Sequence, residues 1–149
     1  MEEIIFQNSS LYSRYLIGEA RYLMLKATQK ELAPYNISPR QAYILFILYN
    51  HGHKAKLAEL ANHGERLIST LSIQIARMEK MGLVKKIREP HKTTLLSIEL
   101  TEKGINVCKN SNKMDADQEI MSVLSEEERQ QLIPILKKII GKATEYISS

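Results

Sequence analysis

The segment from residue 69 to residue 82 combines hydroxyl, amide and cationic side chains with apolar ones at the spacing of an amphipathic helix. Leu71, Ile75 and Met78 recur every three or four residues, which predicts one apolar face. Hydroxyls, an amide and cations fall on the remaining faces, and such groups contact phosphates and base edges in the DNA major groove. The residues predicted to contact DNA here and just before the helix are Arg66, Ser69, Thr70, Ser72, Ile73, Gln74, Arg77 and Lys80. The alternative is an ordinary solvated helix face.

Two short strands are expected after this helix. Gly82 suits the left-handed conformation that ends a helix. Residues 83–89 and 95–100 have strand character, and the loop between them contains Pro90. The pattern predicts a β-hairpin with a basic tip, a wing whose Arg88, His91 and Lys92 reach the DNA backbone or the minor groove.

The segments before the helix complete a helix-turn-helix. Residues 57–61 predict a short helix, and Gly64 lies in the turn that follows it. Ser38 and Pro39 suit the cap and the first position of a strongly apolar helix, which we expect to be the core helix. Residues 54–56 are interpreted as a short link.

Long helices are predicted on both sides of this region. Residues 9–34 are expected to form the first, and one helix is expected from 102 to about 123. Ser125 and Glu128 predict a capping box at the start of the last helix. Pro134 should kink this last helix or displace its first turns. We predict one mostly α domain with a small β-hairpin wing, in which helices 9–34 and 102–148 flank a winged helix-turn-helix at 37–101. Pairing of two copies through these helices would bury their apolar stripes and place two reading helices ~34 Å apart.

The net charge of +4 is unevenly distributed. Residues 54–92 contain nine Lys or Arg and four Asp or Glu, a net charge of +5, so the remainder carries −1. A localised basic region is typical of a nucleic-acid surface, and the alternative is a mildly basic solvated face.

The sequence gives little support for a secreted protein, a membrane protein or an enzyme. A single cysteine, Cys108, excludes an intrachain disulfide and fits a reducing compartment. The acidic N-terminus does not resemble a signal peptide, and no stretch approaches the ~20 apolar residues of a membrane span, so we expect a cytoplasmic protein with no membrane partner. Catalytic motifs are missing, so we expect neither an enzyme nor a cofactor.

The order of these motifs resembles the MarR family of bacterial and archaeal transcriptional regulators. Residues 37–45, 59–61, 69–72 with 78–84, 100–104 and 124–128 resemble five successive family motifs, and the resemblance covers nearly the whole chain. It implies a homodimer on a palindromic operator, usually a repressor released by a small ligand or by oxidation. The family's wing usually carries Asp-x-Arg, but Lys92 and Thr94 occupy those places here, and Ile73 replaces a basic residue. These departures keep open a winged-helix module that binds protein.

Several residues suggest an effector or a sensor. Family pockets lie between the dimerisation helices and the winged domain, so an anionic or aromatic effector could be bound there. The candidates are Arg14, Tyr15, Arg21, Tyr22 and Tyr43. Tyrosines at helical spacing are also typical of cores and interfaces. Cys108 is expected to be a buried, inert thiol, and histidines 51, 53, 63 and 91 lack zinc-site spacing, so we expect no metal site.

Overall fold

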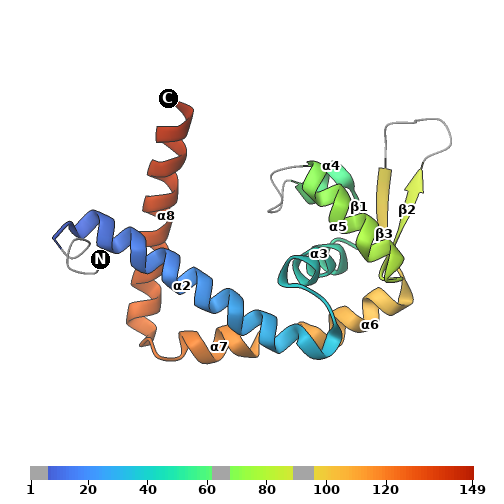
Figure 1. Cartoon of the computed structure of the whole chain (residues 1–149), viewed down its shortest axis with the longest axis horizontal. Coiled ribbons are helices and arrows are strands. Elements are labelled where there is room, and N and C mark those ends of the chain that lie inside the picture. Colours follow the sequence, from blue (N-terminus) through green and yellow to red (C-terminus); the bar gives the residue numbers. More distant parts are fainter. Residues whose placement is uncertain (1–6, 62–67, 89–95) are drawn as a thin grey trace. The chain divides into compact units, whose positions relative to one another are not determined.

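The computed structural model describes residues 7–61, 68–88 and 96–149, which form two compact units that divide after Met114 (Figure 1). The first unit contains the predicted winged helix-turn-helix and the second contains the last two helices. The fold is mostly helical with one small antiparallel sheet, as predicted. None of the helices in the described ranges is long and apolar enough to cross a membrane.

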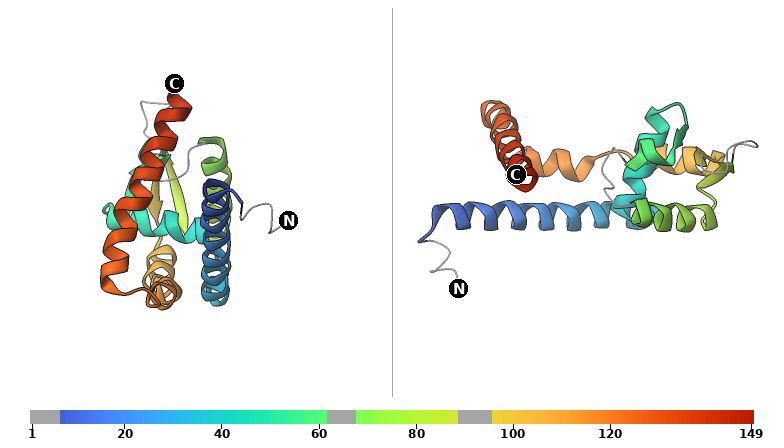
Figure 2. Two further views of the ribbon diagram at one scale, coloured as in Figure 1. Left: turned by 90° about the vertical axis from the view of Figure 1, so that its left-hand side faces the viewer. Right: turned by 90° about the horizontal axis from the view of Figure 1, so that it is seen from above.

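The first long helix, α2, spans Ser9–Leu32. Asn8 caps it, because its side-chain oxygen accepts from the Leu11 N–H at 3.0 Å. A 3-10 turn at Ala33–Tyr35, which contains Pro34, follows the helix. Leu32 is the only buried residue of α2, and the helix extends away from the other elements of its unit (Figure 2).

The core helix α3 spans Pro39–Asn50 and begins as predicted, with Ser38 as cap and Pro39 in the first turn. Ser38 and Gln41 form a reciprocal capping box that the sequence interpretation did not include. Ile44, Leu45 and Leu48 of this helix are buried.

The sheet has three strands rather than the two of the predicted hairpin. Strands β1 (Lys54–Lys56), β2 (Val84–Arg88) and β3 (Leu96–Leu100) are antiparallel in the order β1-β3-β2. The interpretation of 54–56 as a link was therefore wrong. Ala55 is buried opposite Ile98 while the lysines beside it are exposed, which is the alternation of an edge strand.

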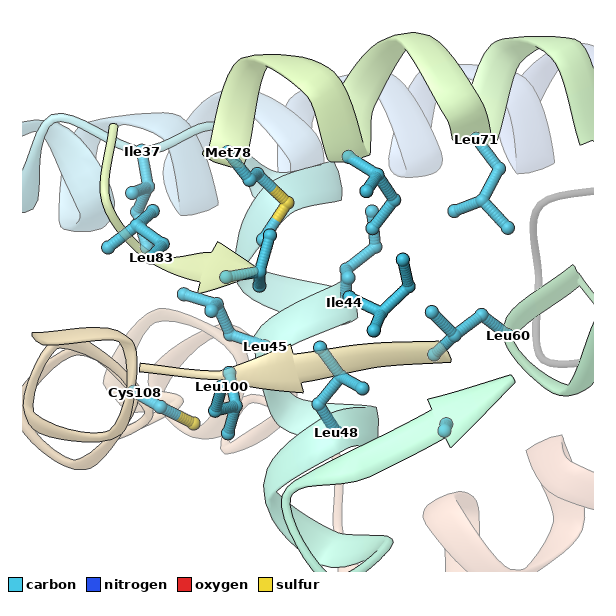
Figure 3. Packing of buried hydrophobic residues seen from close by; sticks show 14 of the residues in the cluster. Ile37, Ile44, Leu45, Leu48, Leu60, Leu71, Met78, Leu83, Leu100 and Cys108 are labelled. Atoms are coloured by element: carbon cyan, nitrogen blue, oxygen red, sulfur yellow. The ribbon is translucent and has the colours of Figure 1, made fainter. Parts of the chain in front are cut away.

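Helices α4 (Leu57–Ala61), α5 (Ile68–Lys80) and α6 (Glu102–Ser111) complete the first unit. Their buried side chains join those of α3 and the sheet in one hydrophobic core. Figure 3 shows Ile44 of α3, Leu60 of α4 and Leu71 of α5 in this core. Burial of this apolar surface is what holds α5 in place.

The single helix predicted from 102 to about 123 is wrong, because it is two helices. α6 ends at Ser111, Met114 has a positive φ of 54°, and α7 spans Asp115–Met121. Asn110 lies in the last turn of α6 and Asn112 is the residue that follows the helix, and asparagine favours helix ends and turns over helix interiors. The division between the two units falls at this break.

The last helix, α8, spans Glu126–Ser148 and begins with the predicted capping box of Ser125 and Glu128. Pro134 lies inside this helix without displacing its first turns, since the helix begins eight residues earlier at Glu126, directly after the Ser125 cap. Proline has no N–H, so the Gln130 carbonyl lacks its usual helical donor.

Candidate nucleic-acid interface

Helix α5 has the two faces predicted from its sequence. Leu71, Ile75 and Met78 are completely buried, so they anchor the helix on the core. Ser72 and Arg77 are exposed, and Ile73 is 54% exposed, on the side that faces away from the core. Thr70 and Gln74 are partly buried at the flank, and Lys80 is exposed at the C-terminal end. The exposed face thus offers a hydroxyl, an aliphatic group and two cations.

Part of the predicted set lies outside the described residues. Arg66, His91 and Lys92 fall in those segments, and the backbone of Ser69 belongs to α5 but its side chain is not described. The helix and strand β2 therefore contribute the described candidates, which are Thr70, Ser72, Ile73, Gln74, Arg77, Lys80 and Arg88.

The C-terminal end of α5 is closed by a Schellman motif. The Gly82 N–H donates to the Glu79 carbonyl and the Leu83 N–H to the Met78 carbonyl, both at 3.0 Å. Gly82 has a φ of 76°, a conformation that favours glycine. This turn directs the chain from α5 into β2, so it sets the start of the wing relative to the helix.

Side chains at the start of α6 hold this turn. The Thr101 hydroxyl donates to the Gly82 carbonyl at 2.5 Å, and Lys103 Nζ donates to the Met81 carbonyl at 2.8 Å. Glu79 Oε2 accepts from the Lys86 N–H at 3.1 Å, which joins α5 to strand β2. These bonds position the wing strands relative to the exposed face of α5.

Cations also line the sheet. Lys85, Lys86 and Arg88 of β2 are exposed. Lys54 of β1 and Lys85 of β2 both pair in register with Glu99 of β3, and Lys85 Nζ lies 3.9 Å from Glu99 Oε1. The pair is solvated and contributes little stability, but it leaves an excess of positive charge on the sheet.

Sequence reasoning counted the lysines of β1 in the basic region but missed that they lie on a strand of the sheet. The Lys-Ala-Lys alternation at 54–56 has the two-residue period of a strand and was a usable signal. A link between Gln41 and Gln74 was also missed: Gln41 Nε2 donates to Gln74 Oε1 at 3.4 Å, from α3 to α5. No local pattern identifies that pair, because 33 residues separate them.

The effector candidates come from two elements. Arg14, Tyr15, Arg21 and Tyr22 are exposed on α2, and their seven-residue spacing puts the two arginines on one face and the two tyrosines on the next. The Lys26 ammonium lies 5.5 Å from the centre of the Tyr22 ring. Tyr43 is exposed on α3.

Cysteine and histidine were considered as possible redox or metal sensors, and the described residues form neither a reactive thiol site nor a metal site. Cys108 is buried, and burial raises the pKa of its thiol, as expected for an inert cysteine. His51 Nε2 lies 3.7 Å from Glu59 Oε2, and no three His, Cys, Asp or Glu side chains are grouped for a metal in the described ranges. His63 and His91 lie outside those ranges.

Known proteins share the sequence pattern and the fold described above. Residues 37–91 match the model of the MarR family, and the sequence has no significant match among curated proteins. An organohalide-sensing RdhR transcriptional regulator with bound 2,4-dichlorophenol has a TM-score of 0.84 at 23% identity, over 91% of this chain and 81% of that one. The Staphylococcus aureus MepR–DNA complex has a TM-score of 0.78 at 25% identity, over 87% and 96%.

A third structure, a MarR variant from Escherichia coli complexed with operator DNA, has a TM-score of 0.75 at 21% identity, over 84% of this chain and 91% of that one. The MarR family consists of transcription regulators rather than enzymes. The matched segment covers the core helix, the helix-turn-helix and the start of the wing, whose geometry is described above. Residues 37–91 thus match the MarR family model, and the chain has the winged helix-turn-helix fold of the MarR and MepR structures, as the resemblance implied.

Proposed function

We propose that the protein is a sequence-specific regulator of transcription that binds double-stranded DNA through the exposed face of α5. The observation that carries the proposal is the division of α5 into a fully buried apolar stripe and an exposed face with Ser72, Ile73 and Arg77. Arginine contacts guanine or phosphate, and an exposed isoleucine suits a thymine methyl group. MepR and E. coli MarR, whose folds are similar, have been crystallised with DNA.

The wing is proposed to contact the DNA backbone or minor groove. Arg88 is exposed at the end of β2, and His91 and Lys92 follow it in the sequence. The hydrogen bond from the Lys86 N–H to Glu79 supports a defined wing position relative to α5. Lysine and arginine at these places supply phosphate contacts even without the Asp-x-Arg pair.

The active form is proposed to be a homodimer on a palindromic operator. Leu16 and Leu23 of α2 are exposed, as are Ile133, Ile140 and Ile147 of α8. A second copy would bury these apolar surfaces and match the two-fold symmetry of an operator. Sedimentation should give a species of twice the 17.1 kDa chain mass, whereas a monomer at all concentrations would contradict the dimer.

We also propose that the protein is a cytoplasmic repressor and that a small ligand releases it from its operator. A structurally similar regulator has been crystallised with 2,4-dichlorophenol, which is an aromatic ligand of the kind we propose. The exposed Tyr15 and Tyr22 offer aromatic surfaces, and Arg14 and Arg21 offer charge to an anionic effector. Weakening of DNA binding by a phenol or an aromatic acid would support this part, and no effect across such compounds would contradict it.

Paired substitutions test the reading helix. After selection of a preferred duplex from a randomised library, the affinities of Arg77→Ala and Lys109→Ala should be compared by fluorescence anisotropy. Both side chains are exposed and each variant loses one positive charge, but Lys109 lies on α6. We expect Arg77→Ala to weaken binding roughly 5- to 150-fold, as for a base or phosphate contact of ~1–3 kcal/mol, and Lys109→Ala to change it little. Equal affinities at matched salt would contradict the proposed face.

A further inference from the structure

Three polar groups form a continuous chain of hydrogen bonds from the start of α3 to the exposed helix α5. The Ser38 N–H donates to Gln41 Oε1 at 3.0 Å, and Gln41 Nε2 donates to Gln74 Oε1 at 3.4 Å. The Gln41 N–H in turn donates to Ser38 Oγ at 3.1 Å, which closes the capping box. The cap of the core helix is thereby connected to a side chain at the flank of the reading face.

The orientation of the Gln41 amide follows from its partners. A backbone N–H only donates, so the Ser38 N–H requires the oxygen of Gln41 and not its NH2 group. Gln41 is only 8% exposed, so its NH2 group needs an acceptor within the protein. The Gln74 oxygen is that acceptor, and none of the buried side-chain polar atoms in the described chain lacks a partner.

The same logic orients Gln74. An NH2 group only donates, so Gln74 must turn its oxygen toward Gln41. Gln74 is partly exposed, and its own NH2 group is the part of the amide that is not used in this bond. A free glutamine presents a donor and an acceptor together, which is how it recognises adenine through N6 and N7. Here the oxygen is turned toward Gln41, so it does not face the base together with the NH2 group.

We propose that Gln41 determines the base preference of Gln74 by fixing its amide with the NH2 group outward. On this basis Gln74 recognises an acceptor that adenine and cytosine lack at that place, O6 of guanine or O4 of thymine, in preference to a bidentate contact with adenine. The inference rests on the proposed function of α5 and adds to it a specificity-determining residue that does not itself face the DNA.

Substitution of the buried partner separates this role from direct contact. Gln41→Glu keeps an oxygen for the Ser38 N–H, since glutamate is equally suited to a capping box. Its second oxygen only accepts, so Gln74 must turn its NH2 group inward and its oxygen toward the DNA. Gln41→Met has a similar length but forms neither bond, so it leaves the Gln74 amide free. The residues on the DNA-facing surface of α5 are the same in all three proteins.

The first measurement needs no DNA. Side-chain amide exchange by 15N NMR should show protected NH2 protons for Gln41 and rapidly exchanging ones for Gln74 in the wild type. In Gln41→Glu the Gln74 NH2 protons should exchange several-fold more slowly, and in Gln41→Met they should remain fast. Gln74 exchange that is identical in folded wild type and Gln41→Glu, with folding checked by circular dichroism, would overturn the amide link.

The second measurement is selection from a randomised duplex library with each protein. We expect one position per half-site to prefer guanine or thymine in the wild type, and cytosine or adenine, which present a donor, in Gln41→Glu. Gln41→Met should lose a preference of at least about fivefold at that position alone. The same preference in all three proteins would overturn the specificity role. If the wild type enriches no sequence, the proposed function fails as well, while the exchange data still decide the amide link separately.

Discussion

Gly104 supports the junction between α6 and the end of α5 by having no side chain. A Cβ at this position would lie 2.1 Å from the Leu83 carbonyl oxygen and 3.3 Å from Leu100 Cδ2. The helix cannot simply move away, because the Thr101 N–H donates to the same Leu83 oxygen at 3.1 Å. Thr101 Oγ1 also accepts from the Gly104 N–H at 3.0 Å. Gly104→Ala should therefore disrupt this junction.

The expected cost follows from these contacts. Relief of the overlap requires a shift of about 1 Å, and overpacking of this kind costs ~1–3 kcal/mol. The shift weakens the hydrogen bonds of Thr101, at ~1 kcal/mol each, whereas the better helix propensity of alanine returns about 1 kcal/mol. We expect a net destabilisation of about 2–4 kcal/mol, which for a chain of this size lowers Tm by roughly 4–16 °C.

Thermal unfolding followed by circular dichroism measures this effect, with Gly141→Ala as the matched control. Gly141 is also helical, a Cβ added to it would have nothing within 4 Å, and it lies beside Lys137, Lys138 and Glu145 on the polar side of α8. Gly141→Ala should raise stability by about 0.5–1 kcal/mol. Protein concentration must be equal in all samples, because dimerisation contributes to Tm. A Gly104→Ala protein as stable as Gly141→Ala would refute the reasoning.

Three further predictions concern single contacts. Glu79→Ala removes the acceptor of the Lys86 N–H and should weaken binding to the selected duplex more than Glu79→Gln, which keeps a carbonyl oxygen; equal anisotropy curves would contradict this. The Cys108 thiol should react with Ellman's reagent much more slowly in native protein than in urea, since burial raises its pKa. Hydrogen bonds from Ser125 lower the pKa of Glu128, so its stabilising effect is present above the ordinary carboxyl pKa and is lost as pH falls through the lowered value. Glu128→Gln should reduce the loss of Tm in acid, and an unchanged pH profile would count against this.

The features that the sequence predicted correctly are those set by neighbouring residues. The caps of α3 and α8 depend on Ser38 and Ser125, and the two faces of α5 follow from the spacing of its apolar residues. Gly82 ends α5 where a left-handed residue is needed. These features can be predicted from the sequence because the interacting groups are only three or four residues apart.

The features that were missed depend on distant partners or on marginal propensity. Strand β1 is three residues long and is a strand only because Ala55 pairs with Ile98. The break between α6 and α7 depends on weak helix formers around Asn112, which the apolar pattern did not indicate. The Gln41–Gln74 bond joins residues from different helices, so only the assembled core brings the two amides together.

The most direct test of the central claim is anisotropy of the purified protein on duplex DNA from upstream of its own gene, with a random duplex as control, over a range of salt. A regulator that binds phosphates and reads bases should bind its own duplex more tightly, with log affinity falling against log salt by ~0.9 per phosphate contact. Arg77→Ala should weaken this binding. Weak, salt-insensitive binding that is equal for both duplexes, or no binding at all, would contradict the assignment and favour a winged-helix module that binds protein.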